Sequence, residues 1–308
     1  MTNEATASAA TAGQRSGLEL TAYLALAAAV GGVSWSALFV RWAEVPGIVS
    51  AFYRVLFAGA VLIPWRLARG AARPVSPRTA WTAVAGGVFF ALDLALWNTA
   101  VMRTQAAVAT VLGNNTPVFV GIMAWLAFRR TPRRSFWAGL ALAVTGCVLI
   151  MSAGSRLTTA PGTVSGNVLA LAASMFFGAY LLTTERIRAS MDTLTFSTLA
   201  IVGSVATLFI ICVSSGLPLV GHPARTWAAL AGLGLISQLG AYYALVYALG
   251  HLPATITSVG LLAQVPSTAL LAMLLLDEPL TPVQVLGGAI VLMGIYVVNS
   301  DPVRTGPV

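Results

Sequence analysis

The sequence predicts an all-α membrane protein, with ten transmembrane helices arranged as two inverted five-helix repeats. Of its 308 residues, 58% are hydrophobic and only 8% are charged, with a mean hydropathy of +0.86. Soluble domains carry about 25% charged residues, so this composition excludes an ordinary soluble domain. Long apolar windows recur along the chain, and one pattern of Pro, Gly and polar residues occurs twice.

The apolar windows place the helices in order. The first, residues 20–40, is longer than the apolar core of a signal peptide, so we expect a helix that is retained. Residues 1–17 are rich in Ala, Thr, Ser and Gly, which predicts a disordered cytoplasmic tail. The other nine windows are residues 46–65, 80–102, 105–128, 135–153, 164–184, 193–215, 226–250, 254–276 and 282–299.

The distribution of Arg predicts the orientation of these helices. All seventeen basic residues are Arg, and they give a net charge of +8. Twelve lie in the two termini and the loops on the same side as the termini, four lie in the opposite loops, and Arg54 lies within the second window. The positive-inside rule therefore predicts a multi-pass protein of the bacterial inner membrane with both termini in the cytoplasm. Short Arg runs between apolar segments do not indicate a nucleic-acid partner.

The internal repeat divides the chain into residues 18–155 and 164–300. Residues 104–110, Pro117, Gly139 and Gly146 in the first half are echoed by residues 253–258, Pro266, Gly287 and Gly294 in the second. Because each half holds an odd number of helices, the second half must cross the membrane in the opposite sense. Inverted repeats around a site at the bilayer midplane are typical of secondary transporters. The paired glycines predict close helix packing, either between the halves or between subunits.

Several motifs resemble a known family. Residues 249–255, 264–266, 275–281 and 284–288 resemble the C-terminal repeat of EamA-type proteins of the drug/metabolite transporter superfamily, and residues 98–100 and 52–54 match more loosely. The overall pattern resembles the bacterial aromatic amino-acid exporters of this superfamily, the YddG-like proteins. The resemblance implies an EamA fold, a cavity lined by helices 1, 3, 4, 6, 8 and 9, alternating access by rocking of helix bundles, and export of aromatic amino acids and related metabolites.

Two departures from the superfamily qualify this expectation. Pro279 stands where EamA-type proteins commonly have Arg. The first helix has no acid after Glu19, whereas small multidrug relatives use a Glu in the middle of that helix to couple transport to protons. Proton coupling by that route is therefore not expected.

Arg54 and Asp93 are the only charges deep inside the apolar windows. At 1.5 Å per residue, each lies about 12–13 Å below the same membrane surface. Since charges within the bilayer usually pair with each other, we predict a structural ion pair between Arg54 and Asp93. The alternatives are that one of them binds the ammonium or carboxylate of a zwitterionic substrate, or that Asp93 takes up a proton.

Aromatic and amide residues deep in the helices are candidate substrate-binding groups. Such rings in membrane helices more often form interfacial belts or pack the core, but several lie well inside their windows and predict a chamber in which they stack on an apolar substrate. The amides near Pro117 and Pro266 either satisfy the backbone groups freed by those prolines or contact substrate. The substrate-binding candidates are Trp35, Phe90, Asp93, Trp97, Asn98, Asn114, Asn115, Phe177, Tyr180, Gln238, Tyr242, Tyr243 and Gln264.

Together these features predict a transporter that exports aromatic or other apolar amino acids and related metabolites. The alternatives are a broad drug or metabolite efflux pump coupled to protons through Asp93, and a structural or receptor-like bundle. The sequence offers no Asp pair, Ser/His couple or His cluster for hydrolysis, so no enzyme, cofactor or metal is expected. We expect a small-molecule substrate, a lipid bilayer around the chain, and a monomer.

Overall fold

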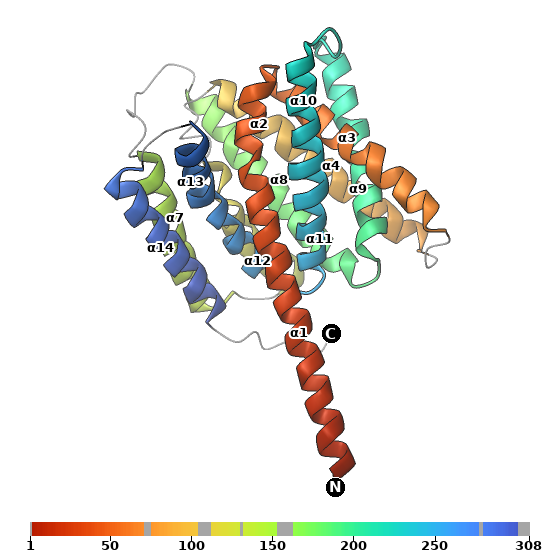
Figure 1. The fold of residues 1–308 in the computed structure, drawn as a ribbon, viewed down its shortest axis with the longest axis vertical. Coiled ribbons are helices and arrows are strands. Elements are labelled where there is room, and N and C mark those ends of the chain that lie inside the picture. The colour runs from red at the N-terminus through yellow and green to blue at the C-terminus, as the bar shows by residue number, and fades with distance from the viewer. Residues whose placement is uncertain are drawn as a thin grey trace.

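The computed structural model describes residues 2–70, 75–103, 112–129, 132–152, 163–276 and 280–300, and these residues are almost entirely helical (Figure 1). The first repeated run, residues 104–110, lies outside the described residues, as does Pro279. In the first half the helices are α1 (Thr2–Ser34), α2 (Ser36–Ala43), α3 (Gly47–Ala68), α4 (Pro77–Arg103), α6 (Thr116–Phe128) and α7 (Arg134–Ser152). In the second half they are α8 (Thr163–Arg188), α9 (Thr193–Ser214), α10 (Ala224–Gly232), η1 (Leu233–Tyr242), α11 (Tyr243–Leu249), α12 (Ala254–Gly260), η2 (Leu261–Ala263), α13 (Gln264–Leu276) and α14 (Pro282–Asn299).

The predicted membrane segments are present within the described ranges. By length and composition, eight helical segments can cross a membrane, and two shorter apolar helices, Thr116–Ala127 and Arg134–Ile150, fill the places of the fourth and fifth windows. Many large apolar side chains point outward, among them Leu67, Trp81 and Leu126. A soluble domain would bury most of these groups, whereas lipid is as apolar as they are. The chain is a multi-pass membrane protein.

The N-terminal segment differs from the sequence prediction. Helix α1 begins at Thr2, so residues 2–17 continue the first membrane helix rather than form a disordered tail. They project alone from the bundle at the N-terminal end (Figure 1). Alanine has the highest helix propensity, and the Ala-rich stretch here extends a helix that the membrane segment has already nucleated.

In the part of the chain that the structure describes, three of the membrane helices are broken or irregular in the middle. The first is interrupted at Trp35, between α1 and α2. The eighth contains a ten-residue π-helix, η1, between α10 and α11. The ninth narrows to the 3₁₀ turn η2 just before Pro266, which has no N–H to donate back to Leu262. π-Helical segments are rare and occur frequently at functional sites, which directs attention to η1.

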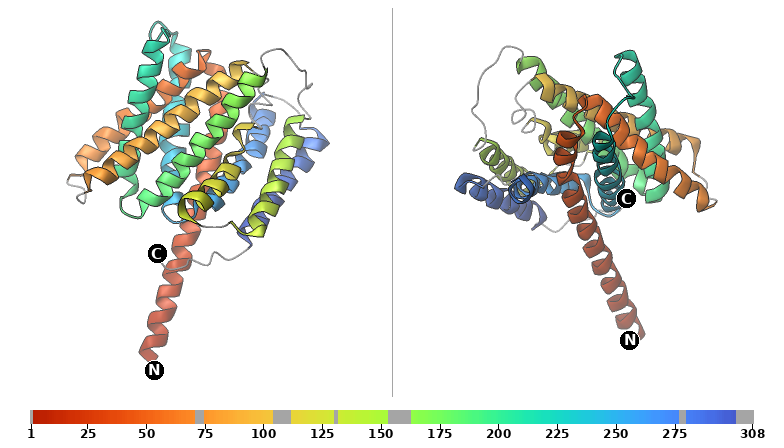
Figure 2. Two further views of the ribbon diagram at one scale, coloured as in Figure 1. Left: turned by 180° about the vertical axis from the view of Figure 1, so that it is seen from behind. Right: turned by 45° about the horizontal axis from the view of Figure 1, so that its top comes forward.

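The helices pack into one bundle with α7 and α14 on one flank and α3 and α9 on the other (Figures 1 and 2). The most extensive packing joins α7 to α14 and α4 to α8, and α4 also packs along α9. Helix α1 runs beside η1 and α11 and also contacts α13. This arrangement places η1 next to both α1 and α3 inside the bundle.

The repeated glycines form the contact between the fifth helices of the two halves. A Cβ built on Gly139 would lie 2.5 Å from the carbonyl oxygen of Gly294, and one on Gly146 would lie 2.5 Å from that of Gly287. Because the lower-numbered glycine meets the higher-numbered partner, α7 and α14 run antiparallel. The same contact from both copies is what two halves of opposite orientation require. Of the two predicted places for glycine packing, the structure shows the contact between halves.

We expect Gly146→Ala to destabilise the protein by about 1–3 kcal/mol, because the added methyl would meet backbone atoms of α14 that cannot yield without separating the helices. Thermal unfolding of the detergent-solubilised protein measures the effect. Gly31→Ala is the control, since a Cβ there has nothing within 4 Å. Unfolding of Gly146→Ala at the same temperature as Gly31→Ala would show that α7 and α14 are not in close contact.

Candidate functional site

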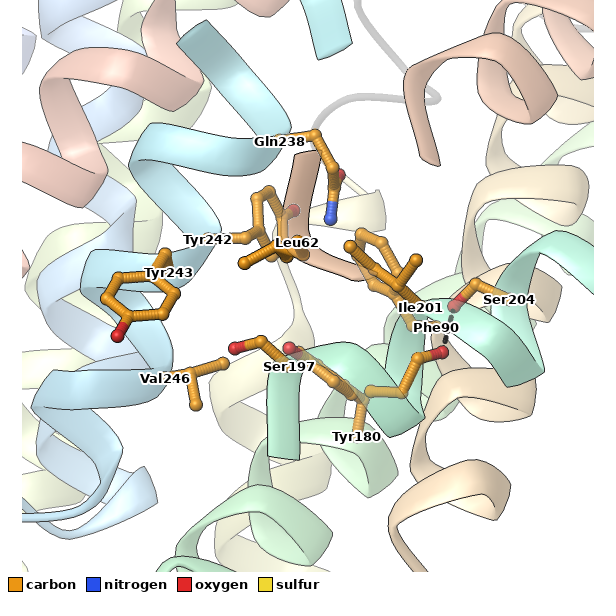
Figure 3. A pocket seen from close by; sticks show the side chains of 11 residues that line it. Leu62, Phe90, Tyr180, Ser197, Ile201, Ser204, Gln238, Tyr242, Tyr243 and Val246 are labelled. Atoms are coloured by element: carbon orange, nitrogen blue, oxygen red, sulfur yellow. Dashed lines mark hydrogen bonds between the residues drawn. The ribbon is translucent and has the colours of Figure 1, made fainter. Parts of the chain in front are cut away.

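A small buried cavity lies beside η1, between α3, α4, α8, α9 and α11 (Figure 3). Its volume is about 20 Å³, which is room for about one water molecule. The lining residues are Leu62, Phe90, Tyr180, Ser197, Ala200, Ile201, Ser204, Gln238, Tyr242, Tyr243 and Val246. An amino acid therefore fits in this cavity only if the surrounding helices separate.

Four aromatic rings form one wall of this cavity and its immediate surroundings. The ring centre of Phe90 lies 4.7 Å from that of Tyr242 and 5.0 Å from that of Tyr180, and Phe177 stacks on Tyr180 at 6.0 Å. These rings come from α4, α8 and η1, as the sequence predicted for a chamber. Their tilted and stacked geometry is that of rings packed within a core, and their faces are suited to contact an aromatic or bulky apolar side chain.

Arg54, on α3, contacts Gln238 and Tyr242 of η1. Its side chain is buried, its Nε donates to Gln238 Oε1 at 2.7 Å, and its guanidinium lies over the Tyr242 ring, 5.0 Å from the ring centre. Its Nη2 is buried without a hydrogen-bond partner. A buried donor left unsatisfied costs about 1–3 kcal/mol, so this nitrogen calls for an acceptor that the described residues do not supply.

Asp93 is near Arg54 but is not joined to it directly. Among the described residues no ion pair within 4.0 Å links the two side chains, although Arg54 acts electrostatically on Asp93. The direct ion pair that the sequence predicted is therefore replaced by the contacts of Arg54 with Gln238 and Tyr242. Asp93 as a whole residue is of intermediate burial, but its carboxyl group lies in the interior of the bundle. The two charges lie near each other because they are at matching depths on two helices. The guanidinium, however, contacts Gln238 and Tyr242 of η1 instead of the Asp93 carboxylate.

Other predicted site residues have structural partners away from the cavity lining. Asn98 donates to the carbonyl oxygen of Gly47 at 2.8 Å and so holds α4 against the first residue of α3. Trp97 packs closely on Gly113, since a Cβ on that glycine would lie 2.9 Å from the indole ring. Trp35 stacks on Phe39, with 6.0 Å between ring centres. None of the three lines the cavity that the described residues enclose.

The amides near the repeated prolines form a second polar cluster. Gln264 Nε2 donates to Asn114 Oδ1 at 3.1 Å, which joins the broken helices of the two halves. Thr268 donates to the carbonyl oxygen of Ser34 at 3.3 Å, so the break in the first membrane helix meets the ninth. Asn115 donates to the carbonyl oxygen of Leu112 at 3.3 Å. Both predicted roles, satisfying freed backbone groups and facing substrate, remain compatible with this geometry.

Sequence reasoning missed the contribution of α3 and α9 to the cavity. The unanticipated lining residues are Leu62 of α3, Ser197, Ala200, Ile201 and Ser204 of α9, and Val246 of α11. One signal was available: in an apolar membrane helix, small polar residues mark faces that pack on neighbours. Ser197, Gly203 and Ser204 follow that pattern in α9. The resemblance implied lining by the first, third, fourth, sixth, eighth and ninth membrane helices. The third, sixth and eighth contribute to the cavity in the described residues, and the first, fourth and ninth do not.

Two halves of apolar helices, glycine-paired in opposite directions around a closed polar and aromatic cavity, define a transporter fold. The EamA-like transporter family model matches residues 20–152 and 164–300, so the chain belongs to this family. This confirms the predicted family and fold, and it assigns the protein to the transporters rather than to the enzymes.

Similar proteins agree with this assignment. The "Uncharacterized transporter YwfM" of Bacillus subtilis is 27% identical over 208 residues, which cover 67% of this chain and 69% of the relative. An "Uncharacterized transporter" of Archaeoglobus fulgidus is 28% identical over 255 residues, covering 81% and 86%. A solved crystal structure shares the fold, with a TM-score of 0.78 and 20% identity over 91% of this chain and 96% of that chain.

Proposed function

We propose that the protein exports aromatic or other apolar amino acids and related metabolites from the cytoplasm by alternating access. The observation that carries this proposal is the cavity itself, where flat aromatic rings stand beside a buried guanidinium and hydrogen-bonding side chains. A ligand with an apolar ring and a polar end matches both parts of that lining. The Arg distribution supports cytoplasmic termini in a bacterial inner membrane. In this proposal the protein acts as a monomer.

The closed cavity is consistent with alternating access. A cavity of about 20 Å³ cannot hold an amino acid, so substrate enters only when one half of the bundle moves relative to the other. The broken first, eighth and ninth helices supply positions where such movement is absorbed without breaking whole helices. In this proposal the closed state lies between the states that are open to each side.

Release of labelled amino acids from liposomes that contain the protein tests the proposal. Purified protein is reconstituted in vesicles loaded with labelled amino acids, and release is followed with and without a pH gradient. We expect release of phenylalanine, tryptophan and leucine above the rate of protein-free vesicles, and little release of aspartate or lysine. Absence of release for every amino acid in the panel would end the exporter proposal.

Asp93 supports a second candidate, proton-coupled efflux of drugs or metabolites. This carboxyl group lies close to Arg54 but is not held in an ion pair with it among the described residues, which leaves it as the candidate group for proton exchange. If it couples transport to protons, Asp93→Asn abolishes the response to the pH gradient and retains release down a substrate gradient. An unchanged gradient response in Asp93→Asn would exclude that coupling route.

A further inference from the structure

The side of the cavity formed by η1 and α9 presents two hydrogen-bond donors for which the described residues supply no acceptor. Gln238 is 95% buried, and its Oε1 accepts from Arg54 Nε. An Arg side chain carries donors only, so Gln238 must turn its oxygen toward Arg54, and its amide nitrogen then faces the other way. Figure 3 shows this nitrogen pointing into the cavity. The hydrogen bonds of the described residues leave it without an acceptor.

Ser197 supplies a second donor at the same cavity. Its side chain lines the cavity and is buried, and its Oγ makes no hydrogen bond among the described residues. Most Ser and Thr side chains in membrane helices donate to the carbonyl of a residue one turn earlier, as Thr198 does to Leu194 at 2.8 Å. Ser197 departs from that pattern, whereas Ser204, which also lines the cavity from α9, donates to the carbonyl oxygens of Ala200 and Gly87. The hydroxyl proton of Ser197 is therefore available to a ligand.

Arg54 makes the Gln238 amide a stronger donor. A charged donor on Oε1 polarises the whole amide group and strengthens the hydrogen bond that Nε2 can give, because chained hydrogen bonds reinforce one another in a medium of low dielectric constant. The guanidinium also places a positive charge directly behind this donor, at a point where water screens it little. The unpartnered Nη2 shows that the described residues do not use the full donor capacity of Arg54.

We infer that the cavity between η1 and α9 binds the carboxylate end of the transported molecule through Gln238 Nε2 and Ser197 Oγ, with Arg54 positioning and polarising Gln238. This inference rests on the proposed function, because it assigns the carboxylate end of the proposed amino-acid substrates. Two neutral donors backed by a cation match the acceptor lone pairs and the charge of a carboxylate. The rings of Phe90, Tyr180 and Tyr242 then lie where the apolar side chain of the ligand extends.

Gln238→Glu separates this role from folding. A glutamate at position 238 still accepts from Arg54 Nε, so the buried guanidinium keeps its partner, but the cavity-facing donor becomes an acceptor. Binding of labelled phenylalanine and of phenylalaninamide to the detergent-solubilised full-length protein is compared. The two ligands differ only in a carboxylate replaced by an amide. We expect the ratio of the two affinities to shift by about tenfold or more toward the amide.

Ser197→Ala provides an independent measurement that leaves the Arg54 contacts untouched. We expect about tenfold weaker binding of phenylalanine and a smaller change for phenylalaninamide. Thr198→Val is the matched control, because it removes a neighbouring hydroxyl that is already bonded to Leu194 and does not line the cavity. Its affinity for phenylalanine should equal that of the unmodified protein.

The outcomes distinguish this inference from the proposed function. If Ser197→Ala binds phenylalanine as Thr198→Val does, and Gln238→Glu keeps its preference for the carboxylate, these donors serve only water and the inference is overturned. Transport of amino acids in liposomes together with that result would leave the proposed function standing. Binding that follows the expected pattern without transport would overturn the proposed function and support the carboxylate site.

Discussion

Gly87→Ala is expected to be the most damaging single-methyl substitution in this protein. A Cβ at Gly87 would lie 1.8 Å from the carbonyl oxygen of Ala200, well inside the distance at which atoms repel. The obstacle is backbone rather than a side chain that can rotate, so α4 and α9 must separate. We expect a loss of at least about 3 kcal/mol in the free energy of unfolding, the upper end for overpacked sites. Thermal unfolding in detergent measures it.

The same substitution should also alter the cavity. Ala200 and Ser204 line it, and Ser204 Oγ donates to the Gly87 carbonyl oxygen at 2.8 Å. Separation of α4 from α9 therefore breaks this hydrogen bond and moves one wall of the cavity. We expect the Gly87→Ala protein that remains folded to lose phenylalanine binding. Ligand binding measured on the folded fraction, isolated by size-exclusion chromatography, tests this second effect.

Gly86→Ala is the matched control for Gly87→Ala. It adds the same methyl one residue earlier in the same helix, where the nearest atom is the Thr183 methyl carbon at 3.3 Å. A side-chain methyl can move by a few tenths of an ångström, so this variant should unfold close to the unmodified protein. Equal destabilisation by both substitutions would mean that the loss of glycine itself, and not the crossing of α4 and α9, sets the effect.

The sequence predicted the membrane segments well because their signal is local. An apolar window of about twenty residues is sufficient to define a span, and the helices begin and end within a few residues of most predicted windows. The paired glycines were equally legible, since Gly139 and Gly146 recur at the spacing of Gly287 and Gly294 and only a close helix contact needs residues without side chains. The repeat therefore predicted close glycine packing, and the structure decided that the contact lies between α7 and α14.

The details of the candidate site were harder to predict because they depend on contacts distant in sequence. Gln238 and Tyr242 lie on a π-helix, and no composition signal distinguishes that segment from an ordinary helix. Asn98 was expected to face substrate, but its partner, Gly47, lies 51 residues away. Whether a deep amide faces a ligand or a backbone carbonyl is decided by the neighbouring helix. A single sequence does not show which helix that is.

The acidic and basic residues at the end of α8 hold the connection between α11 and α12. Arg188 Nε donates to the Val246 carbonyl oxygen at 3.2 Å, near the C-terminal end of α11, and also binds the Met191 carbonyl oxygen. Glu185 accepts from the backbone nitrogen of Ala254, the first residue of α12, at 3.1 Å. A cation near a helix C-terminus and an anion at a helix N-terminus both interact favourably with the partial charges of those helix ends. One turn of α8 therefore stabilises both ends of this connection.

In the proposed orientation this connection lies at the cytoplasmic side of the bundle. If the helices separate at that side, we expect the end of α8 to release α11 or α12. Gly250 explains why the contact is so close, because a Cβ there would lie 2.8 Å from Arg188 Nη2. The strength of closure therefore depends on Arg188, whose charge-assisted hydrogen bonds contribute about 1.5–3 kcal/mol each.

We expect Arg188→Ala to loosen this end of the bundle. Leu252 is buried between α11 and α12, so a Leu252→Cys reporter should react slowly with a polar maleimide in the otherwise unmodified protein. Loss of about 1.4 kcal/mol of closing free energy raises the open population about tenfold, and labelling in the Arg188→Ala background should accelerate by at least that factor. Arg225→Ala, which removes an exposed Arg elsewhere, is the control. If the reporter reacts equally fast in both backgrounds, Arg188 does not hold this end closed, and closure must come from apolar packing around Leu252 alone.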